Sequence, residues 1–399
     1  MFYLNQLGLV CALGDNHDQI RRRLLNGESG VVMTDRYSAG KPLSLGCVDT
    51  PLPSAEDLPV AQRSRNNQLA LAALAQIRPQ VDAAIAKYGA DRIAIVVGTS
   101  TSGVAESESA FRQQLVSGVF PAQFTYAQQE MGSVAAMLSQ LLGVSGPAYV
   151  HSSACASSSK AMASAARMLK MGICDAVITG GVDSLCAFTV AGFSALESVS
   201  VERCNPFSAH RNGINIGEGA ALFLMTAEPA TVSLRGWGES SDGHHISAPD
   251  PNGSGARLAI ERALSSAGIT AAQIDYINLH GTATLQNDAM ESRVIADMFD
   301  AQRIGKRVAA SSTKPYTGHA LGAAGAIEAG LCWLMMQNGD STDVEGRLPP
   351  HLWDGVRDAS LPDLTLVAQG DRLGRPVDWI LSNSFAFGGA NAVLILGRE

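Results

Sequence analysis

Aromatic and charged residues are scarce in this chain of 399 residues, at 6% and 17%, whereas 46% of the residues are hydrophobic and 40 are glycine. So large an apolar share argues against intrinsic disorder. The formal net charge is −8, and the chain has no dense basic stripe of the kind that a nucleic-acid-binding protein displays. The composition therefore predicts a well-buried globular protein that does not bind nucleic acid.

Paired cysteine motifs and long apolar runs are also missing. An odd number of scattered cysteines without CxxC spacing argues against a disulfide framework and against a zinc site, so no metal is predicted. The first residues lack the basic and then apolar order of a signal peptide. The longest apolar stretch, 320–336, is interrupted by Glu328 and is too short for a membrane span. We expect a cytoplasmic enzyme with no membrane partner. The seven cysteines are Cys11, Cys47, Cys155, Cys174, Cys186, Cys204 and Cys332.

Short β-branched apolar segments alternate with longer helical patterns along the chain. This alternation predicts the α/β class, with a largely parallel sheet covered by helices. The predicted strands are 92–97, 176–179, 220–225, 276–279 and 393–396, and the predicted helices are 66–77, 158–170, 256–267 and 288–298.

The two halves of the chain echo one another. Segment 153–157 opens a helix of small residues, as segment 318–325 does later, and each half ends in a Gly-rich turn that leads into an apolar strand, at 216–221 and at 387–392. The echo predicts a duplicated α/β unit divided at Pro229, with domains 1–229 and 230–399.

Among the cysteines, Cys155 is the best candidate for a reactive nucleophile. It follows the strand-like segment 148–150 and precedes a helical run, so unpaired N–H groups and the helix dipole would favour its thiolate and could hold an oxyanion. An ordinary small buried cysteine is the alternative for any one position. Cys174, Cys186 and Cys332 lie inside apolar patterns, and we interpret them as structural.

Two histidines have settings that suit catalysis. His280 ends a predicted strand before a polar glycine turn, and His319 precedes a helical pattern shortly after Lys314. A Cys/His metal site is formally open but disfavoured, because the candidates lie far apart in sequence. Segments 157–160 and 311–314 fit a short S-x-x-K pattern that recurs by chance, and no phosphate-binding glycine loop is present.

Four blocks in order carry a resemblance that covers nearly the whole chain. With them the chain resembles the β-ketoacyl-acyl-carrier-protein synthases, which are ketosynthases of the thiolase-like superfamily. The blocks are 152–158 around Cys155, 280–291 from His280 to Glu291, 312–328 from Ser312 to Glu328, and 383–391 from Asn383 to Asn391.

The resemblance implies a thiolase-like fold, a duplicated α/β unit layered α-β-α-β-α, and a decarboxylative Claisen condensation. Cys155 would carry the acyl group, and His280 and His319 would stabilise the enolate formed from a malonyl thioester on acyl carrier protein. Lys314 would fix His319, with Glu328 as its partner.

The resemblance also assigns residues around this centre. The backbone N–H groups of Cys155 and Phe387 would form an oxyanion hole, and Phe387 with Phe385 would gate the acyl pocket. Thr282 and Thr284 would bind the pantetheine arm, which the carrier supplies, so that no separate cofactor is implied. Arg63, Arg65 and Arg203 match carrier-docking regions, although solvated helix-face arginines are an equal alternative.

Two departures from the family pattern bear on the substrate. Glu106-Ser107-Glu108 stands where relatives place apolar residues near the acyl pocket, and Ala386 replaces a common glycine of the gating loop. The polar segment favours a shorter, polyunsaturated or aryl-bearing chain, as in aryl polyene or other type II polyketide synthesis, over a plain fatty chain.

Other members of the superfamily give the alternatives. A chain-length-factor-like partner subunit keeps the fold without catalysis, but such partners usually lack the nucleophile. A degradative thiolase would carry a second reactive cysteine near the final glycine loop, where this chain has none. We expect a homodimer, while a heterodimer with a related subunit stays open, as do the acyl chain length and the pathway.

Overall fold

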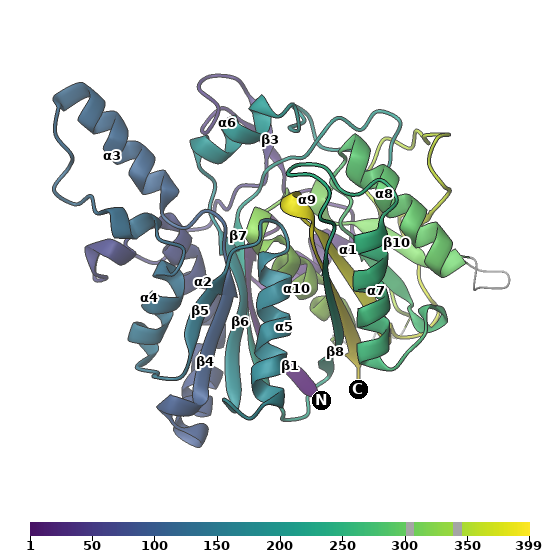
Figure 1. Ribbon diagram of the computed structural model, residues 1–399, viewed down its shortest axis with the longest axis horizontal. Helices are drawn as coiled ribbons and strands as arrows, with labels where there is room; N and C mark the ends of the chain where they lie inside the picture. Colours follow the sequence, from purple (N-terminus) through teal and green to yellow (C-terminus); the bar gives the residue numbers. More distant parts are fainter. Residues whose placement is uncertain (301–306, 338–344) are drawn as a thin grey trace.

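Strands and helices alternate through the computed structural model, which describes residues 1–300, 307–337 and 345–399 (Figure 1). The strands are β1 Phe2–Cys11, β2 Val32–Thr34, β3 Leu43–Leu45, β4 Ile93–Gly98, β5 Ala148–His151, β6 Ala176–Asp183, β7 Gly219–Thr226, β8 Val232–Ser241, β9 Tyr276–Leu279, β10 Ala309–Ser312, β11 Thr365–Leu366, β12 Trp379–Phe385 and β13 Ala390–Arg398. The α-helices are α1 His17–Leu25, α2 Arg65–Tyr88, α3 Val104–Ser117, α4 Ser133–Leu142, α5 Ser157–Lys170, α6 Ala187–Ala195, α7 Ser254–Ala267, α8 Leu285–Ile295, α9 Lys314–Thr317 and α10 Ala324–Met336.

The order of the main strands repeats between the two halves. The first half runs β1-β7-β6-β4-β5, and the second runs β8-β13-β12-β9-β10 with β11 added at the edge. In both halves the first three strands are antiparallel and the remaining pairs are parallel. The halves meet where Phe2 and Tyr3 of β1 pair with Leu234 and Ser233 of β8. The duplication expected from the sequence echo is thus present in the topology.

Two helices lie between the two halves of the sheet. Figure 1 shows α5 and α10 between the strands of the first half on its left and those of the second half on its right, with α2 and α4 outside the former and α7 and α8 outside the latter. Gly325 in α10 allows the central helices to meet, because a Cβ there would lie 2.1 Å from Ser159 Oγ of α5. This arrangement is the α-β-α-β-α layering of the thiolase-like fold.

The predicted elements are present, with differences at their ends. The expectation of a largely parallel sheet is wrong, because the sheet is mixed: β1, β7, β8, β12 and β13 pair antiparallel along its middle. The predicted strand 276–279 has the bounds of β9, and the predicted helix 288–298 passes into a π-helical turn, Ala296–Asp300. The helix predicted to open at Gly318 begins only at Ala324, because Gly318 and Leu321 have left-handed φ angles of 68° and 46°. The chain leaves β7 at Thr226 and enters β8 at Val232, while a division at residue 229 stays a prediction.

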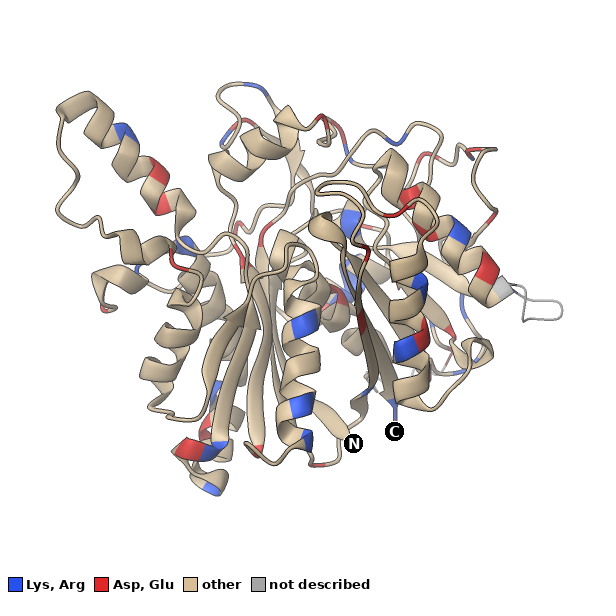
Figure 2. Cartoon of the chain, in the orientation of Figure 1, with Lys and Arg blue, Asp and Glu red and all other residues tan. Residues whose placement is uncertain are grey.

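Helix α3 projects away from the layered body (Figure 1). Its outer half and the loop that follows carry no Lys, Arg, Asp or Glu from 113 to 129 (Figure 2). Several of its apolar side chains are exposed, among them Leu115 at 81% and Val116 at 90%. Within the described ranges, no helix is long and apolar enough to cross a membrane.

Candidate active site

Cys155 lies in a strained turn two residues before α5. The turn is closed by Ser157, whose Oγ accepts a hydrogen bond from Ser153 N at 2.8 Å and donates one to the carbonyl of Ala154 at 2.6 Å. Ala154 itself has a φ of 47°, which a side chain rarely adopts. The Cys155 side chain is buried, and its Sγ lies 3.0 Å from Nε2 of His319. The local strain aims the sulfur at an imidazole from the other half of the chain.

The electrostatic setting of Cys155 keeps it a thiol at neutral pH. Burial raises the pKa of Cys155 to about 11, against the opposing effects of the Lys314 charge and of the backbone N–H groups of Phe387 and Cys155. The sequence predicted that a helix N-terminus would favour the thiolate, but the sulfur is enclosed and precedes the helix, so burial dominates. The two N–H groups lie together beside the sulfur, close to where the oxygen of an attacked thioester would form.

His319 is held by its backbone rather than by its ring. Its N–H donates to the carbonyl of Asn215 at 2.6 Å, and its carbonyl accepts from Gly217 N at 2.9 Å. Burial, with the Lys314 charge nearby, lowers the pKa of His319 well below its usual value, so the ring is neutral. Among the described residues, Nδ1 has no hydrogen-bond partner. The protein therefore does not fix one tautomer, and Nε2 can either accept a proton or donate one.

His280 is oriented from two sides at the end of β9. The backbone N–H groups of His280 and Gly281 donate to the two carboxylate oxygens of Glu291, each at 2.7 Å. On the other side, Lys314 Nζ lies 3.4 Å from Nδ1 of the ring. Burial and the Lys314 charge lower the pKa of His280 well below its usual value. A neutral ring that accepts from Lys314 at Nδ1 carries its proton at Nε2, so Nε2 is a donor.

The position of Lys314 corrects one expectation. The resemblance implied that Lys314 fixes His319, whereas its nearest histidine nitrogen is Nδ1 of His280. The lysine also donates to Glu328 Oε1 at 2.5 Å, and both side chains are buried. Burial raises the pKa of Glu328 to about 7, against the pull of the Lys314 charge. Parallel pairing of β9 with β10 explains the placement, since His280 and Lys314 follow neighbouring strand ends.

The loop after β12 closes one side of the cavity. Phe385, Ala386 and Phe387 line the cavity, and the Phe387 ring packs against Phe193 of α6 with centroids 5.7 Å apart. Gly388 and Gly389 have φ angles of 79° and 74°, so the glycines stand where the backbone needs them. Ala386 has an ordinary extended φ of −102°, so nothing in its backbone angle calls for glycine there.

The lining of the cavity also includes polar residues. Thr282 and Thr284 line it, and their hydroxyl groups lie 2.9 Å apart. Ser198, Ser247 and Asn287 add further polar groups. Such a wall can hydrogen-bond an amide-containing arm that reaches toward Cys155.

Comparison with known proteins identifies the kind of site. The N-terminal domain model of the β-ketoacyl synthases matches residues 7–230, and the C-terminal domain model matches residues 231–343. The chain belongs to the β-ketoacyl synthase family. It is therefore an acyltransferase that forms carbon–carbon bonds.

Individual relatives span the whole chain. Nodulation protein E of Rhizobium sp. (strain N33) is 32% identical over 97% of this chain and 96% of its own length. The 3-oxoacyl-[acyl-carrier-protein] synthase 2 of Staphylococcus aureus is 30% identical over 98% of each protein. Among solved structures, one chain of the complex between the ketosynthase ApeO and its chain length factor ApeC from Xenorhabdus doucetiae is 44% identical with a TM-score of 0.92, over 100% of this chain and 98% of that one.

The ketosynthase brings together three residues that could also ligate a metal. One ligand atom each from Cys155, His280 and His319 lies within 4.8 Å of the others. Sequence separation was the argument against such a cluster, and the fold removes that argument. Lys314, beside His280, places a positive charge next to the trio and opposes a second cation. The roles of these residues in thioester chemistry and the absence of a metal both stay predictions.

The three arginines expected to dock a carrier differ in their surroundings. Arg65 donates to the fully buried carboxylate of Glu218 at 2.6 Å and 2.8 Å, and also to the carbonyl of Val48. This corrects the expectation for Arg65, because its guanidinium is already committed inside the ketosynthase. Arg63 is half-buried and donates to a backbone carbonyl, and Arg203 is exposed.

The polar segment Glu106-Ser107-Glu108 does not line the cavity at Cys155. Glu106 Oε1 accepts from the backbone N–H of Arg65 at 2.8 Å, at the start of α2. Ser107 is buried, and its hydroxyl turns back toward the carbonyl of Gly103. The expectation that this segment makes the acyl pocket polar therefore loses its structural basis in the described cavity.

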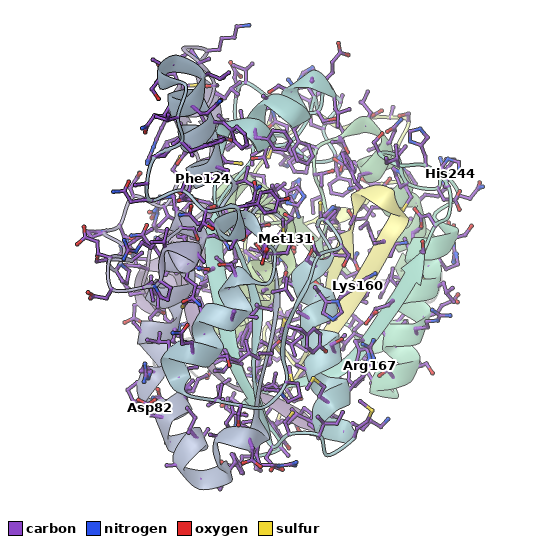
Figure 3. All side chains as sticks on the ribbon, turned by 60° about the vertical axis from the view of Figure 1, so that its left-hand side comes forward. Asp82, Phe124, Met131, Lys160, Arg167 and His244 are labelled. Atoms are coloured by element: carbon purple, nitrogen blue, oxygen red, sulfur yellow. The ribbon has the colours of Figure 1, made fainter. Side chains whose placement is uncertain are left out.

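Two buried residues near the site, Asp183 and His351, were not identified from the sequence. Asp183, at the end of β6, accepts from the backbone N–H groups of Ser100, Thr101 and Gly322, and so ties the two halves together. Its position after a buried strand was the signal that could have found it. His351 accepts from Ser312 N, two residues before Lys314. No local pattern marked it. His244, for which the sequence indicated no role, lies in the loop after β8, at the rim of the molecule (Figure 3).

Proposed function

We propose that this ketosynthase is the catalytic subunit of a type II system, with an acyl chain held on Cys155 and a malonyl unit delivered by acyl carrier protein. One observation carries the proposal: Cys155 Sγ, His319 Nε2 and the N–H groups of Cys155 and Phe387 converge on one buried point. A non-catalytic chain-length-factor role would not require this convergence.

The first half-reaction moves the acyl group from the carrier to Cys155. The thiol gives its proton to neutral His319 Nε2 at 3.0 Å as the sulfur attacks the thioester carbonyl. The N–H groups of Cys155 and Phe387 stabilise the resulting oxyanion. When the carbonyl re-forms, the carrier thiolate leaves and takes the proton from His319, which becomes neutral again.

The second half-reaction forms the carbon–carbon bond. The malonyl carboxylate leaves as carbon dioxide, and its bonding electrons become the enolate of the thioester. His280 donates from Nε2 to the enolate oxygen because Lys314 occupies its Nδ1, and His319 donates in its other tautomer. The enolate carbon then attacks the acyl group on Cys155, the C–S bond breaks, and the sulfur leaves as a thiolate that takes a proton from solvent water.

The carrier reaches the cavity through its phosphopantetheine arm in this proposal, and no further cofactor takes part. Thr282 and Thr284 on the cavity wall support contacts to that arm. Arg63 and Arg203 remain the proposed docking cations on the surface, without Arg65. The name of the Staphylococcus aureus relative, 3-oxoacyl-[acyl-carrier-protein] synthase 2, supports acyl carrier protein as the partner.

We propose that the working assembly pairs this chain with a related, non-identical subunit. The exposed apolar face of α3 and of the loop after it is typical of a surface that a protein partner buries. Phe124, in the loop after α3, packs against Phe111 in the middle of that helix, with ring centroids 5.9 Å apart (Figure 3). Two similar structures, ApeO and the ishigamide ketosynthase, include a chain length factor. A homodimer in a native mass spectrum of the co-expressed pair would overturn this pairing.

The same similarity leads us to propose polyketide assembly over ordinary fatty-acid synthesis, with an aryl polyene among the candidate products. Preferential loading of medium or long saturated chains would overturn that choice. We place the enzyme in the cytoplasm, a compartment that suits its seven free cysteines.

Intact-mass analysis after incubation with a panel of acyl-carrier thioesters tests the catalytic assignment. The wild type gains one acyl mass, and Cys155→Ala gains none. Since all seven cysteines are buried, Cys332→Ala serves as the matched control and loads like the wild type. If the wild type forms no adduct, the catalytic assignment is wrong and the chain is instead a non-catalytic, chain-length-factor-like subunit.

A further inference from the structure

The carboxylate of Glu108, on α3, caps the N-terminus of helix α6. Nothing in the sequence predicted this contact. Its Oε1 accepts from Phe188 N at 2.5 Å and its Oε2 from Ala187 N at 3.2 Å, and these are the first two residues of α6. The N-cap residue of α6, Cys186, supplies no side-chain cap. A carboxylate at this place satisfies two helix N–H groups and meets the positive end of the helix dipole.

Helix α6 has few other anchors. Only Val190 among its residues is buried, and Phe188 is 70% exposed. A helix with so little buried apolar area depends strongly on each polar contact that holds it. The carboxylate of Glu108 is therefore a principal restraint on the position of α6.

The far end of α6 reaches the acyl gate. Phe193 packs on the ring of Phe387, whose backbone N–H faces Cys155 Sγ. Phe193 and Phe387 both line the cavity at Cys155. An acyl group that enters the cavity therefore meets both rings, so the freedom of α6 bears on loading.

Glu106, two residues earlier on α3, provides an internal comparison. Its carboxylate accepts from Arg65 N at the start of α2, on the other side of α3. Neither Glu106 nor Arg65 lines the cavity at Cys155. Two similar glutamates on one helix thus hold two different helices, of which only α6 contacts the gate.

We propose that Glu108 is a positioning residue that sets, through α6, how readily the Phe193–Phe387 gate opens and hence which acyl lengths Cys155 accepts. The proposal rests on the proposed function, since it presupposes that Cys155 is acylated. It assigns to the polar segment of α3 a part in specificity that does not require it to line the pocket.

The test is the ratio of loading rates for an octanoyl and an acetyl thioester, followed by intact mass on the full-length protein in the assembly in which it purifies. In Glu108→Ala the gate loses its restraint, and the octanoyl-to-acetyl ratio rises about fivefold, a factor typical of losing a helix cap. Glu108→Gln keeps one oxygen acceptor without the charge, and its ratio falls between those of the wild type and the alanine variant.

Glu106→Ala is the matched control, because it removes the acceptor of the first N–H of α2, whose N-cap Ser64 remains, and leaves α6 untouched. Its ratio stays at the wild-type value even where its thermal stability falls. An unchanged ratio in Glu108→Ala, or an equal change in Glu106→Ala, would overturn the proposal. If Glu108→Ala does not fold, Glu108→Gln decides by the same comparison. Failure of the wild type to load any chain would instead count against the proposed function.

Discussion

The two halves of the molecule share one topology but supply different chemistry. Each half places a turn before a central helix, and the two turns face one another. In the first half the turn ends two residues before α5 and carries Cys155, whereas in the second half a 3-10 turn, Leu321–Ala323, separates His319 from α10. That extra turn sets the imidazole over the sulfur. Duplication thus supplies the geometry, and small local differences divide the roles.

The buried charged groups nearest His280 come from one half only. Lys314, Glu328 and Glu291 all belong to the second half and surround His280. The first half contributes the sulfur and an N–H group. The nucleophile and the enolate-stabilising donors therefore lie on separate frameworks, and substitutions should separate the two half-reactions.

The largest expected effect comes from removing a donor of the second half. In His280→Ala, malonyl decarboxylation and condensation fall about 10² to 10³-fold, the usual cost of losing one donor to an oxyanion. Acyl loading of Cys155 changes only a few-fold, because His280 takes no part in the first half-reaction. Carbon dioxide release and intact mass measure the two steps, and an equal loss in both would contradict the division between halves.

A smaller effect, but one on both half-reactions, is expected from substitution of His319, which contacts Cys155 from the other half of the chain. His319→Ala loses about 10²-fold in acyl loading, since Cys155 loses its proton acceptor, and it loses condensation as well. Single-turnover loading measured beside His280→Ala supplies the comparison. Wild-type loading in His319→Ala would show that the sulfur needs no imidazole.

The smallest effect concerns stability and its dependence on pH. The pKa of Glu328 is raised to about 7 in the folded protein from an ordinary value of 4.5, so folding favours its protonated form. Its stabilising contribution is complete below about pH 4.5 and is lost as the pH rises through 7. Thermal unfolding should therefore show the wild type losing about 1 to 2 kcal/mol relative to Glu328→Gln between pH 5.5 and pH 8.5. The opposite trend would contradict the raised pKa.

Local patterns predicted much of the fold. Buried β-branched runs predicted β4, β6, β7, β9 and β13, because a strand covered on both faces is apolar throughout. The boundaries were less well predicted where backbone angles intervene, as at Leu321 before α10. Cys155, His280 and His319 were selected from their settings at strand ends and helix starts, and the structure brings them together.

The sequence by itself determined the family and the duplicated α/β class, and it predicted which groups react, since all three depend on short blocks and on periodicity. Only the tertiary structure decided which histidine Lys314 contacts, that Arg65 is committed to Glu218, and that Glu108 holds α6. These are contacts between residues that lie 34 to 153 positions apart in the chain. Their partners are chosen by strand register and helix packing, which no local pattern encodes.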